Sequence, residues 1–403
     1  MVPLLFLFTA CQEQIVNYND GYDDGLTPSG PPTIEQIVLA ADTAGLPKAI
    51  TAAEMGDIVV IQGSNLSQIK SLTFNGIEAD LKSIYAVNSY VVVPVPRVLF
   101  DEADATGKVV IETSKGTAEA NLTVAAPKLV VDGFYNEFAN VGDTVDIVGR
   151  NFDLFEVDSI NGTVKAGDTD VEILAVSERT LTVVVPTETP DGTEFTVSSK
   201  IYAEKRNQPA RLKFREGGGS LMGKAEFENW DQGKGKGPKD GDYRADGKKK
   251  GEPKPLIGLY RDWFIFCDGN LGGSQFIWAG GANVSGDGND PTVADFSNHK
   301  DDYEFKFEML TTRAFTSGSL EFEFGGTKAP WKPSESAAAN TNGKWRTIRF
   351  DAKDALAGTG TGWVNLAIQY SQSVDDAVIG FAMCNFRVAK KVSDTVSYEK
   401  ISK

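Results

Sequence analysis

Gly56-Asp-Ile-Val-Val-Ile-Gln-Gly-Ser-Asn65 opens an internal repeat that decides the fold of the first half of the chain. The same pattern returns as Gly142-Asp-Thr-Val-Asp-Ile-Val-Gly-Arg-Asn151, at a constant offset of 86 residues. Each copy is followed by an Asn-Gly turn signal and then by a valine-rich run ending in proline, at 91–94 and 183–186. Short alternating strands joined by such turns predict two β-sandwiches of about 90 residues each.

This pattern resembles the immunoglobulin-like IPT/TIG domain. The resemblance implies one such sandwich over residues 33–126 and a second over 127–215. Prolines near the junctions fix φ and would stiffen the array. Domains of this kind act as spacers and interaction surfaces in unrelated proteins, so the resemblance implies little about chemistry.

The composition of the chain limits which classes of partner it can bind. The chain has 403 residues, a hydrophobic content of 41% and a formal net charge of −16. Phosphate groups are bound by clustered cations, so this charge argues against nucleic acid or an anionic membrane surface as the main partner. A stretch rich in lysine and glycine, 231–254, is the exception. It is interpreted as a solvated loop, with contact to an acidic glycan or lipid as the alternative.

The amino terminus resembles the end of a secretory signal. An apolar run ends in Thr9-Ala10-Cys11, which resembles a bacterial lipobox. Residues 1–11 are therefore expected to hold the signal, with Cys11 as the lipidated residue and the chain anchored to the cell outer membrane, facing the exterior. The alternative is an ordinary signal peptide in which Cys11 is incidental. Residues 12–32 are polar, acidic and rich in turn formers, which predicts a flexible tether.

A third kind of domain is expected over residues 216–403. The segments 303–309 and 319–324 alternate with period two, which predicts strands that bury Tyr303, Phe305, Phe307 and Met309 in one case and Leu320, Phe322 and Phe324 in the other. The intervening charges Glu304, Glu308, Glu321 and Glu323 are expected to face solvent. The segment therefore predicts a larger β-sandwich, similar to a carbohydrate-binding module, and the whole chain is expected to be all-β.

Every tryptophan of the chain lies in this third domain. Trp331 stands in the proline-bracketed run Lys328-Ala-Pro-Trp-Lys-Pro333, and a ring on a stiff loop makes a preformed platform for a ligand. In Trp363-Val-Asn-Leu-Ala-Ile-Gln-Tyr370, the apolar alternation places Trp363 on the same side as Asn365 and Gln369. A ring beside two amides suits the apolar face and the hydroxyls of a sugar.

Two further tryptophans are candidates with open alternatives. Trp278 precedes a glycine pair and is either a platform or a core ring. Trp345 begins a strand whose core pair is Ile348 and Phe350, and it is either a ligand contact or structural. Trp363 has a structural alternative as well, at the edge of the sandwich. Trp230 and Trp263 are interpreted as core residues.

The third domain resembles the glycan-binding domain of the surface glycan-binding proteins of Bacteroidetes polysaccharide-utilisation loci. The resemblance rests on the order of Tyr303-Glu-Phe-Lys-Phe-Glu308, Ala329-Pro-Trp-Lys-Pro333, Gly343-Lys-Trp-Arg-Thr-Ile-Arg-Phe350 and Cys384-Asn-Phe-Arg-Val388. Cys384 departs from the aspartate of that family. The resemblance implies a β-glucan ligand (xyloglucan, mixed-linkage glucan or β-1,3-glucan), Trp331 as a stacking residue, and other surface proteins of the uptake system as partners.

Other functions are weighed against this one. The sole histidine, His299, sits in a loop-like context, which excludes Ser–His catalysis and multi-histidine metal sites. A glycoside hydrolase needs only two carboxylates, but none of the acidic residues lies in an apolar setting, so no enzyme is expected. A protein-binding adhesin is the main alternative. No cofactor or metal is expected, since Asp287-Gly-Asn-Asp290 lacks a full calcium-loop signature.

Cys267 and Cys384 both lie in apolar runs. They are interpreted as buried small hydrophobic residues, with a disulfide between them as the alternative.

Overall fold

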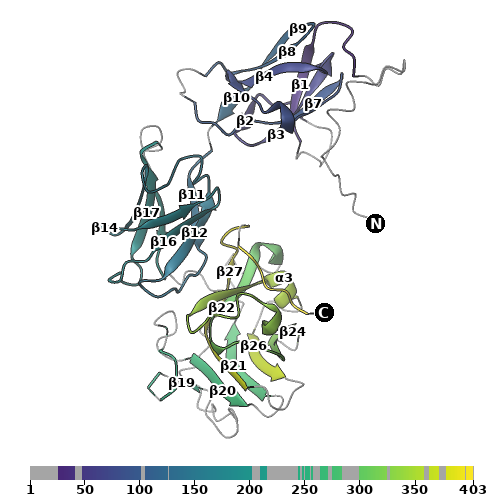
Figure 1. The fold of residues 1–403 in the computed structure, drawn as a ribbon. Helices are drawn as coiled ribbons and strands as arrows, with labels where there is room; N and C mark the ends of the chain where they lie inside the picture. The colour runs from purple at the N-terminus through teal and green to yellow at the C-terminus, as the bar shows by residue number, and fades with distance from the viewer. Residues whose placement is uncertain are drawn as a thin grey trace. The chain divides into compact units, whose positions relative to one another are not determined.

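The computed structural model describes much of the chain and confirms the all-β fold (Figure 1). The described residues are 26–40, 48–100, 105–125, 127–201, 209–215, 244–245, 247–248, 250–254, 256, 264–270, 275–283, 299–324, 327–357, 363–371, 378–394 and 396–402. Several predictions lie outside these residues: those for Cys11, for most of the tether, for Trp230, Trp263 and 287–290, and for most of the stretch 231–254.

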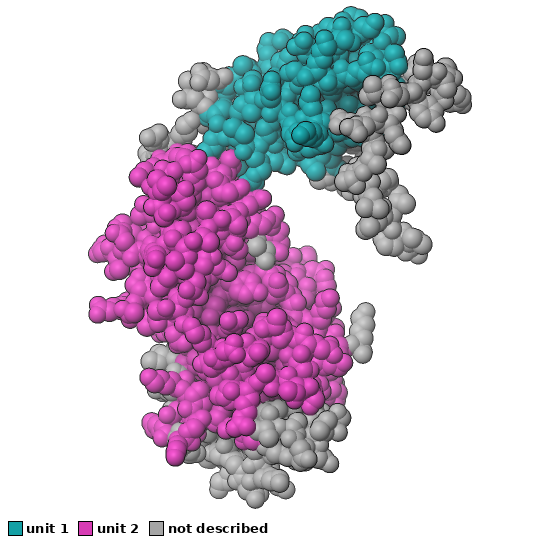
Figure 2. All heavy atoms as spheres, in the orientation of Figure 1, with its two compact units in different colours: residues 1–128 teal, residues 129–403 magenta. Residues whose placement is uncertain are grey.

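Two compact units divide the chain after residue 128 (Figure 2). The first unit holds the first copy of the repeat. The second unit, residues 129–403, holds the second copy together with the carboxy-terminal sandwich. Among the described residues, no helix has both the length and the apolar character needed to span a bilayer.

The first unit is built from two four-stranded antiparallel sheets, β1-β3-β7-β6 and β5-β4-β8-β9, with β10 pairing parallel to β2. Alternate residues of the central strands, such as Val59, Ile61, Val91 and Val93, are fully buried. The elements are β1 (Thr33–Leu39), β2 (Ala52–Glu54), β3 (Ile58–Ser64), β4 (Ile69–Phe74), β5 (Ile77–Glu78), η2 (Leu81–Ser83), β6 (Tyr85–Ala86), β7 (Tyr90–Pro94), β8 (Lys108–Thr113), β9 (Gly116–Asn121) and β10 (Thr123–Ala125).

The second copy of the repeat has the matching sheets β11-β12-β16-β15 and β14-β13-β17-β18. Its strands are β11 (Val130–Phe134), β12 (Thr144–Arg150), β13 (Gly162–Ala166), β14 (Thr169–Asp170), β15 (Ile173–Val176), β16 (Thr180–Val184), β17 (Glu194–Ser199) and β18 (Ala210–Lys213). Strands β3 and β12 have the same length and are offset by the 86 residues of the sequence repeat.

The repeated glycines have a structural reason. A Cβ at Gly63 would lie 1.9 Å from the carbonyl oxygen of Thr33, and one at Gly149 would lie 2.1 Å from that of Val130. Only glycine therefore lets the first strand of each copy pair with the next. Asn65 ends the first motif with a positive φ, which asparagine tolerates.

The carboxy-terminal sandwich has a five-stranded sheet, β19-β20-β27-β22-β25, and a four-stranded sheet, β21-β26-β23-β24. Its elements are β19 (Arg244–Ala245), β20 (Phe264–Asn270), β21 (Gln275–Asn283), η5 (Lys300–Asp302), β22 (Tyr303–Arg313), β23 (Ser319–Phe324), β24 (Thr327–Trp331), η6 (Pro333–Glu335), β25 (Arg346–Asp351), α3 (Ala352–Ala355), β26 (Trp363–Ser371) and β27 (Val378–Lys390).

The core of this sandwich follows the period-two pattern. Its buried members include all four predicted apolar residues of β22, both Leu320 and Phe322 of β23, and the β25 pair Ile348 and Phe350. Phe324 is the exception, because its side chain lies outside the described residues. Alternation in the sequence therefore identified the inward side of these strands correctly.

The two described cysteines are buried and free. Cys267 packs in the main core with Phe381, whereas Cys384 packs with Phe264 in a second apolar cluster. Because the two clusters lie on opposite faces of the same sheet, the two thiols point apart. The interpretation as buried hydrophobic residues holds, and the disulfide alternative is excluded.

Candidate functional site

Trp331 is a core residue, so its prediction as an exposed stacking platform is wrong. Its side chain is only 1% exposed and packs edge-on against Phe350, with ring centroids 5.3 Å apart. The indole N–H donates to Oε2 of Glu399 at 2.9 Å, which satisfies the one polar group of the ring. The opposite carboxylate oxygen, Oε1, accepts from the Ser336 hydroxyl at 2.8 Å.

The local strand explains the error. The prolines around Trp331 suggest a loop, but Thr327–Trp331 forms β24 at the edge of the four-stranded sheet. Proline is tolerated on an edge strand because its missing N–H costs no ladder hydrogen bond. Ala329 and Trp331 then alternate inward, and the last residues of the chain, through Glu399, close over the ring.

Trp345 is also buried, which settles its two alternatives in favour of the structural one. It packs edge-on against Phe264, with centroids 5.7 Å apart, and its indole N–H donates to the carbonyl of Lys254 at 3.1 Å. Its own carbonyl accepts from the side-chain amide of Asn136, a residue of the second repeat copy.

The other four candidates lie on two neighbouring strands, β21 and β26, whose backbone pairing the structure describes and whose side chains lie outside it. Trp278 stands opposite Ala367, Asn365 opposite Gly281, and Trp363 opposite Asn283. Gln369 stands opposite Phe276 on one side and Glu321 on the other. The fold thus gathers Trp278, Trp363, Asn365 and Gln369 on one pair of strands, in a different sheet from β25, which Trp345 directly precedes.

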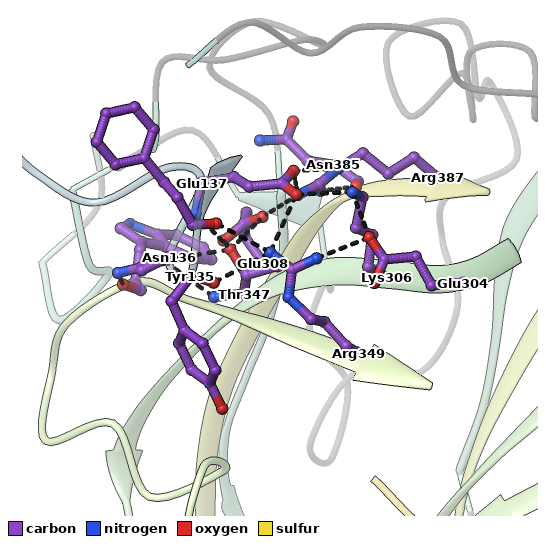
Figure 3. A network of polar contacts seen from close by, with 12 residues as sticks. Tyr135, Asn136, Glu137, Glu304, Lys306, Glu308, Thr347, Arg349, Asn385 and Arg387 are labelled. Carbon is purple, nitrogen blue, oxygen red and sulfur yellow. Dashed lines mark hydrogen bonds and ion pairs between the residues drawn. The ribbon is translucent and has the colours of Figure 1, made fainter. Parts of the chain in front are cut away.

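The charged side of β22 does not face solvent. Glu304 and Glu308 are fully buried, which corrects the prediction that they are solvent-facing, whereas Glu321 and Glu323 of β23 are partly exposed. The five-stranded sheet carries a cluster of buried charges on its outer face (Figure 3). We call it the ion cluster; its members are Glu137, Glu304, Glu308, Lys306, Arg349 and Arg387.

Glu137, from the loop after β11, joins the second repeat copy to this cluster (Figure 3). Its Oε1 accepts from Lys306 Nζ at 2.6 Å and from Arg349 Nη2 at 3.0 Å, and its Oε2 accepts from Arg387 Nη2 at 2.7 Å. Its backbone N–H donates to the hydroxyl of Thr347 at 2.9 Å. One carboxylate therefore meets all three cations of the ion cluster.

The remaining charges are paired within the sheet. Glu304 Oε1 accepts from Lys306 at 2.6 Å and from Arg349 at 2.7 Å, and Glu308 Oε1 accepts from Arg387 at 2.6 Å. A positive φ at Asn385 produces a bulge in β27, where the register with β22 shifts. Such a bulge re-aims the following residues, and here it accompanies the contact of Arg387 with both acids.

An apolar contact lies beside the ion cluster. Phe138, next to Glu137, is fully buried in the same cluster as Leu310, Trp345 and Cys384 of the carboxy-terminal domain. The Arg387 guanidinium lies 5.0 Å from the centroid of its ring, a cation–π distance. The loop 136–138 thus covers the outer face of the five-stranded sheet with one ring and one carboxylate.

The electrostatics of the ion cluster shift the pKa values of two of its acids, Glu137 and Glu308, in opposite directions. Burial raises the pKa of the Glu137 carboxyl, but Arg387, Arg349 and Lys306 outweigh it and bring that pKa well below 4.5. Burial also raises the pKa of Glu308, and with fewer cations against it the pKa stays above its ordinary value. These acids do lie in a buried setting, contrary to the sequence-based view. Each is engaged by ion pairs with cations of the ion cluster.

The sequence signals for this interface are weak. Asn136, Glu137 and Phe138 follow a strand of the second repeat copy, and nothing local marks them as contacts for residues some 170 to 250 positions away. The alternation of charges in β22 was visible, but it is equally typical of a solvated strand.

Comparison with known proteins identifies both kinds of domain. Residues 129–209 match the IPT/TIG domain, and residues 224–390 match the surface glycan-binding protein B xyloglucan binding domain. No curated protein matches the chain in sequence.

Several solved structures are similar to the chain at low identity. A surface glycan-binding protein from Prevotella bryantii is 18% identical, with 90% of this chain and 99% of that one covered and a TM-score of 0.45. A surface glycan-binding protein B from a xyloglucan utilization locus of Bacteroides uniformis is 16% identical, with 89% and 99% covered and a TM-score of 0.41. One from the mixed-linkage glucan utilization locus of Bacteroides ovatus, in complex with a mixed-linkage heptasaccharide, is 10% identical, with 88% and 74% covered and a TM-score of 0.27.

Along the chain, the IPT/TIG match comes first and the match to the glycan-binding domain follows it. Proteins of this kind bind glycans and do not transform them. The chain therefore belongs to the surface glycan-binding protein B family, as a non-catalytic glycan-binding protein of the cell surface.

Proposed function

We propose that the chain captures a neutral β-glucan at the four-stranded sheet of its carboxy-terminal sandwich. The observation that carries the proposal is the match of residues 224–390 to a xyloglucan binding domain. Xyloglucan is therefore the first ligand to test, followed by mixed-linkage glucan and β-1,3-glucan. A sugar polymer without charge also suits a chain with a net charge of −16, because no electrostatic repulsion opposes its approach.

We choose the sheet that binds the ligand by asking which sheet of the sandwich has an uncovered outer face. The outer face of the five-stranded sheet is occupied by the loop 136–138, with Glu137 and Phe138 packed into it. A polysaccharide chain needs a long accessible face, so we assign it to β21-β26-β23-β24. On β23, the partly exposed Glu321 and Glu323 alternate with the buried Leu320 and Phe322, which identifies the outward side of this sheet.

The register supports a row of ligand-binding residues across that outward side. Gln369 pairs with Glu321, and Ala367 pairs with Glu323. Spacing of two along β26 then assigns Asn365 and Trp363 to the same side. On the neighbouring strand the register adds Trp278, opposite Ala367, and a residue that the sequence analysis did not select, Phe276, opposite Gln369.

Stacking of sugar rings on Trp278 and Trp363, with hydrogen bonds from Asn365 and Gln369, is the proposed mechanism. A stacked ring contributes about 0.5–1.5 kcal/mol beyond its buried area. Two rings and a few hydrogen bonds then correspond to dissociation constants on the order of micromolar to millimolar. Affinity of that order suits a surface protein that must release its ligand to an uptake system.

Native affinity electrophoresis in gels that contain each soluble polysaccharide tests the proposal. The parent chain should be retarded by at least one β-glucan, and Trp363→Ala and Gln369→Ala should each lose retardation several-fold. Lys332→Ala, an exposed change just after β24, is the matched control and should migrate as the parent does. An unretarded parent would overturn the function and favour a protein-binding adhesin. Equal retardation of both variants would overturn the assigned face.

We also propose that Cys11 carries the lipid anchor and that the tether holding the domains away from the outer membrane lies within residues 12–25. The end of the expected tether, residues 26–32, is part of the first repeat copy, because Ser67 donates to the carbonyl of Leu26 and Asn88 to that of Thr27. The lipobox resemblance of Thr9-Ala10-Cys11 supports the anchor. Cys11→Ser should move the protein from the membrane fraction to the soluble fraction. Unchanged fractionation would contradict the anchor while leaving the glycan-binding proposal intact.

A further inference from the structure

The first repeat copy presents an unusual outer face on the sheet β1-β3-β7-β6. Val91 and Val93 of β7 are fully buried, so the alternate residues Tyr90, Val92 and Pro94 form the outward side of that strand. The register extends this side across the neighbouring strands: Tyr90 pairs with Gln62, Val92 with both Val60 and Tyr85, and Pro94 with Ile58. The outward residues named here, from β3, β6 and β7, are all uncharged.

Two tyrosines lie together on this face. The rings of Tyr85 and Tyr90 are 5.9 Å apart between centroids, with planes tilted by 37°. The Tyr85 side chain is 51% exposed, although it belongs to a strand and could have packed inward. Beside them the Gln36 amide donates to Oε1 of Gln62, whose backbone pairs with that of Tyr90. Aromatic rings next to side-chain amides are the groups that bind neutral sugars.

The second repeat copy supplies an internal control, because the same register positions carry different residues. Asp146 and Thr182 are paired there, with the Thr182 hydroxyl donating to Asp146 Oδ1 at 2.6 Å, where the first copy has Val60 and Val92. Thr180 and Ala175 occupy the positions of the two tyrosines. A spacer domain needs no aromatic face, and the second copy has none here: Asp146, Thr180 and Thr182 are partly exposed, and Val148, at the position of Gln62, is buried. An exposed apolar and aromatic face such as that of the first copy is typical of an interaction site.

We propose that this face, which we call the tyrosine face (Ile58, Val60, Gln62, Tyr85, Tyr90 and Val92), is a second glycan-binding platform in the chain. Its absence of charge matches a neutral polysaccharide better than an acidic glycan or a charged protein surface. The rings supply stacking area, and the glutamine amides supply hydrogen bonds to sugar hydroxyls. The inference rests on the proposed function only for the choice of ligand, a β-glucan.

A second platform changes how the chain holds a polymer. One polysaccharide molecule that reaches both sites is bound with a higher avidity than either site gives alone. A short oligosaccharide occupies the sites independently and gains nothing from the second one. The tyrosine face should therefore contribute to capture of long chains and leave oligosaccharide binding at the carboxy-terminal domain unchanged.

Because of where the tryptophans lie, ligand binding at the two sites can be measured separately. All six tryptophans lie between residues 230 and 363, so intrinsic tryptophan fluorescence reports on the carboxy-terminal domain and is silent for the tyrosine face. The test compares the full chain with Tyr85→Ala/Tyr90→Ala. Gel retardation by soluble xyloglucan should fall at least threefold, while the midpoint of a fluorescence titration with a xyloglucan oligosaccharide should stay the same.

Two further variants make the result decisive. Leu174→Ala removes an exposed apolar side chain from β15, the corresponding edge strand of the second copy, and should migrate as the parent does. Tyr85→Ser alone, at a half-exposed position, leaves the core untouched and should reduce retardation even if the double variant fails to fold.

Three outcomes would overturn the inference. If the parent is retarded and the tyrosine variants are retarded equally, the platform does not bind glycan, and the proposed function stands. If no β-glucan retards the parent, the proposed function and the choice of ligand fail together. If light scattering shows that the parent is a dimer and the double variant a monomer, with equal retardation of the two, the tyrosine face binds a second copy of the chain.

Discussion

Glu137 and Arg387 are 250 positions apart in the sequence, yet the carboxylate Oε2 of one lies 2.7 Å from the guanidinium Nη2 of the other. The first belongs to the second repeat copy and the second to the last strand of the carboxy-terminal sandwich. Their contact makes the second copy part of the same compact unit as the glycan-binding domain. The part of the five-stranded sheet's outer face that this contact covers is therefore internal structure.

Removing the charge of Glu137 should destabilise the second unit. In Glu137→Gln, three buried cations would face only two carboxylates, Glu304 and Glu308. Leaving a buried charge uncompensated costs about 3–5 kcal/mol, and urea unfolding should show a loss of that order. Glu194→Gln is the control, because its ion pair with Arg211 is exposed and such pairs contribute at most about 1 kcal/mol. Equal effects of the two changes would contradict the role of the ion cluster.

The pH dependence of stability should separate Glu137 from Glu308. The pKa of Glu137 is lowered in the folded chain, so the stability it contributes is present above its unfolded value near 4.5 and is lost as the pH falls through the folded value. Burial raises the pKa of Glu308, so protonation of this group on acidification stabilises the folded chain relative to the unfolded one. Between neutral pH and about pH 3, Glu137→Gln should lose less stability than the parent, and Glu308→Gln should lose more. Urea midpoints at several pH values measure both, and the reverse order would refute the assignment.

Trp331→Ala should act on folding, since the ring lies in the core. Truncating a buried aromatic residue costs about 3–5 kcal/mol, and here the Glu399 carboxylate would also lose its indole donor. Glycan binding by the fraction that remains folded should be unchanged, as judged by affinity electrophoresis at low temperature. Trp331→Phe keeps part of the ring volume and should lose less stability. A selective loss of binding with full stability would restore Trp331 as a ligand contact.

The two buried thiols should be inert in the native chain. Burial raises the pKa of Cys267 to about 12, and burial together with the nearby Glu308 carboxylate raises that of Cys384. Since the thiolate is the reactive form, a disulfide reagent such as Ellman's should leave both unmodified in buffer and modify both in guanidinium chloride. A Cys11→Ser chain removes the third thiol from the count. Rapid native labelling would show that β20 or β27 opens readily.

The sequence allowed the strands and their inward sides to be predicted with few errors. The 86-residue repeat is reproduced by β3 and β12, and the alternation of β22 matches the packing of Phe305 and Phe307 in the core. These features are local, because a strand that faces a hydrophobic core on one side must alternate with period two. Glycine and asparagine likewise mark positions of close approach or positive φ through their own geometry.

The candidate site was harder to predict because its residues depend on what covers each sheet. Trp331 looked exposed from its prolines, and only the closing segment with Glu399 shows why the ring is buried. For Trp363 and Gln369, the sequence indicated the strand and the side, and the register in β26 then set which residues lie opposite them.

By itself, the sequence determined the all-β architecture, the repeat and the side of each strand that enters a core, since these follow from spacing along a few residues. Only the tertiary structure decided which outward side meets water. The charges of β22 are buried because a carboxylate and a phenyl ring arrive from the second repeat copy, some 170 residues earlier in the chain. Alternation distinguishes the two sides of a strand, but it carries no information about a distant loop that covers one of them.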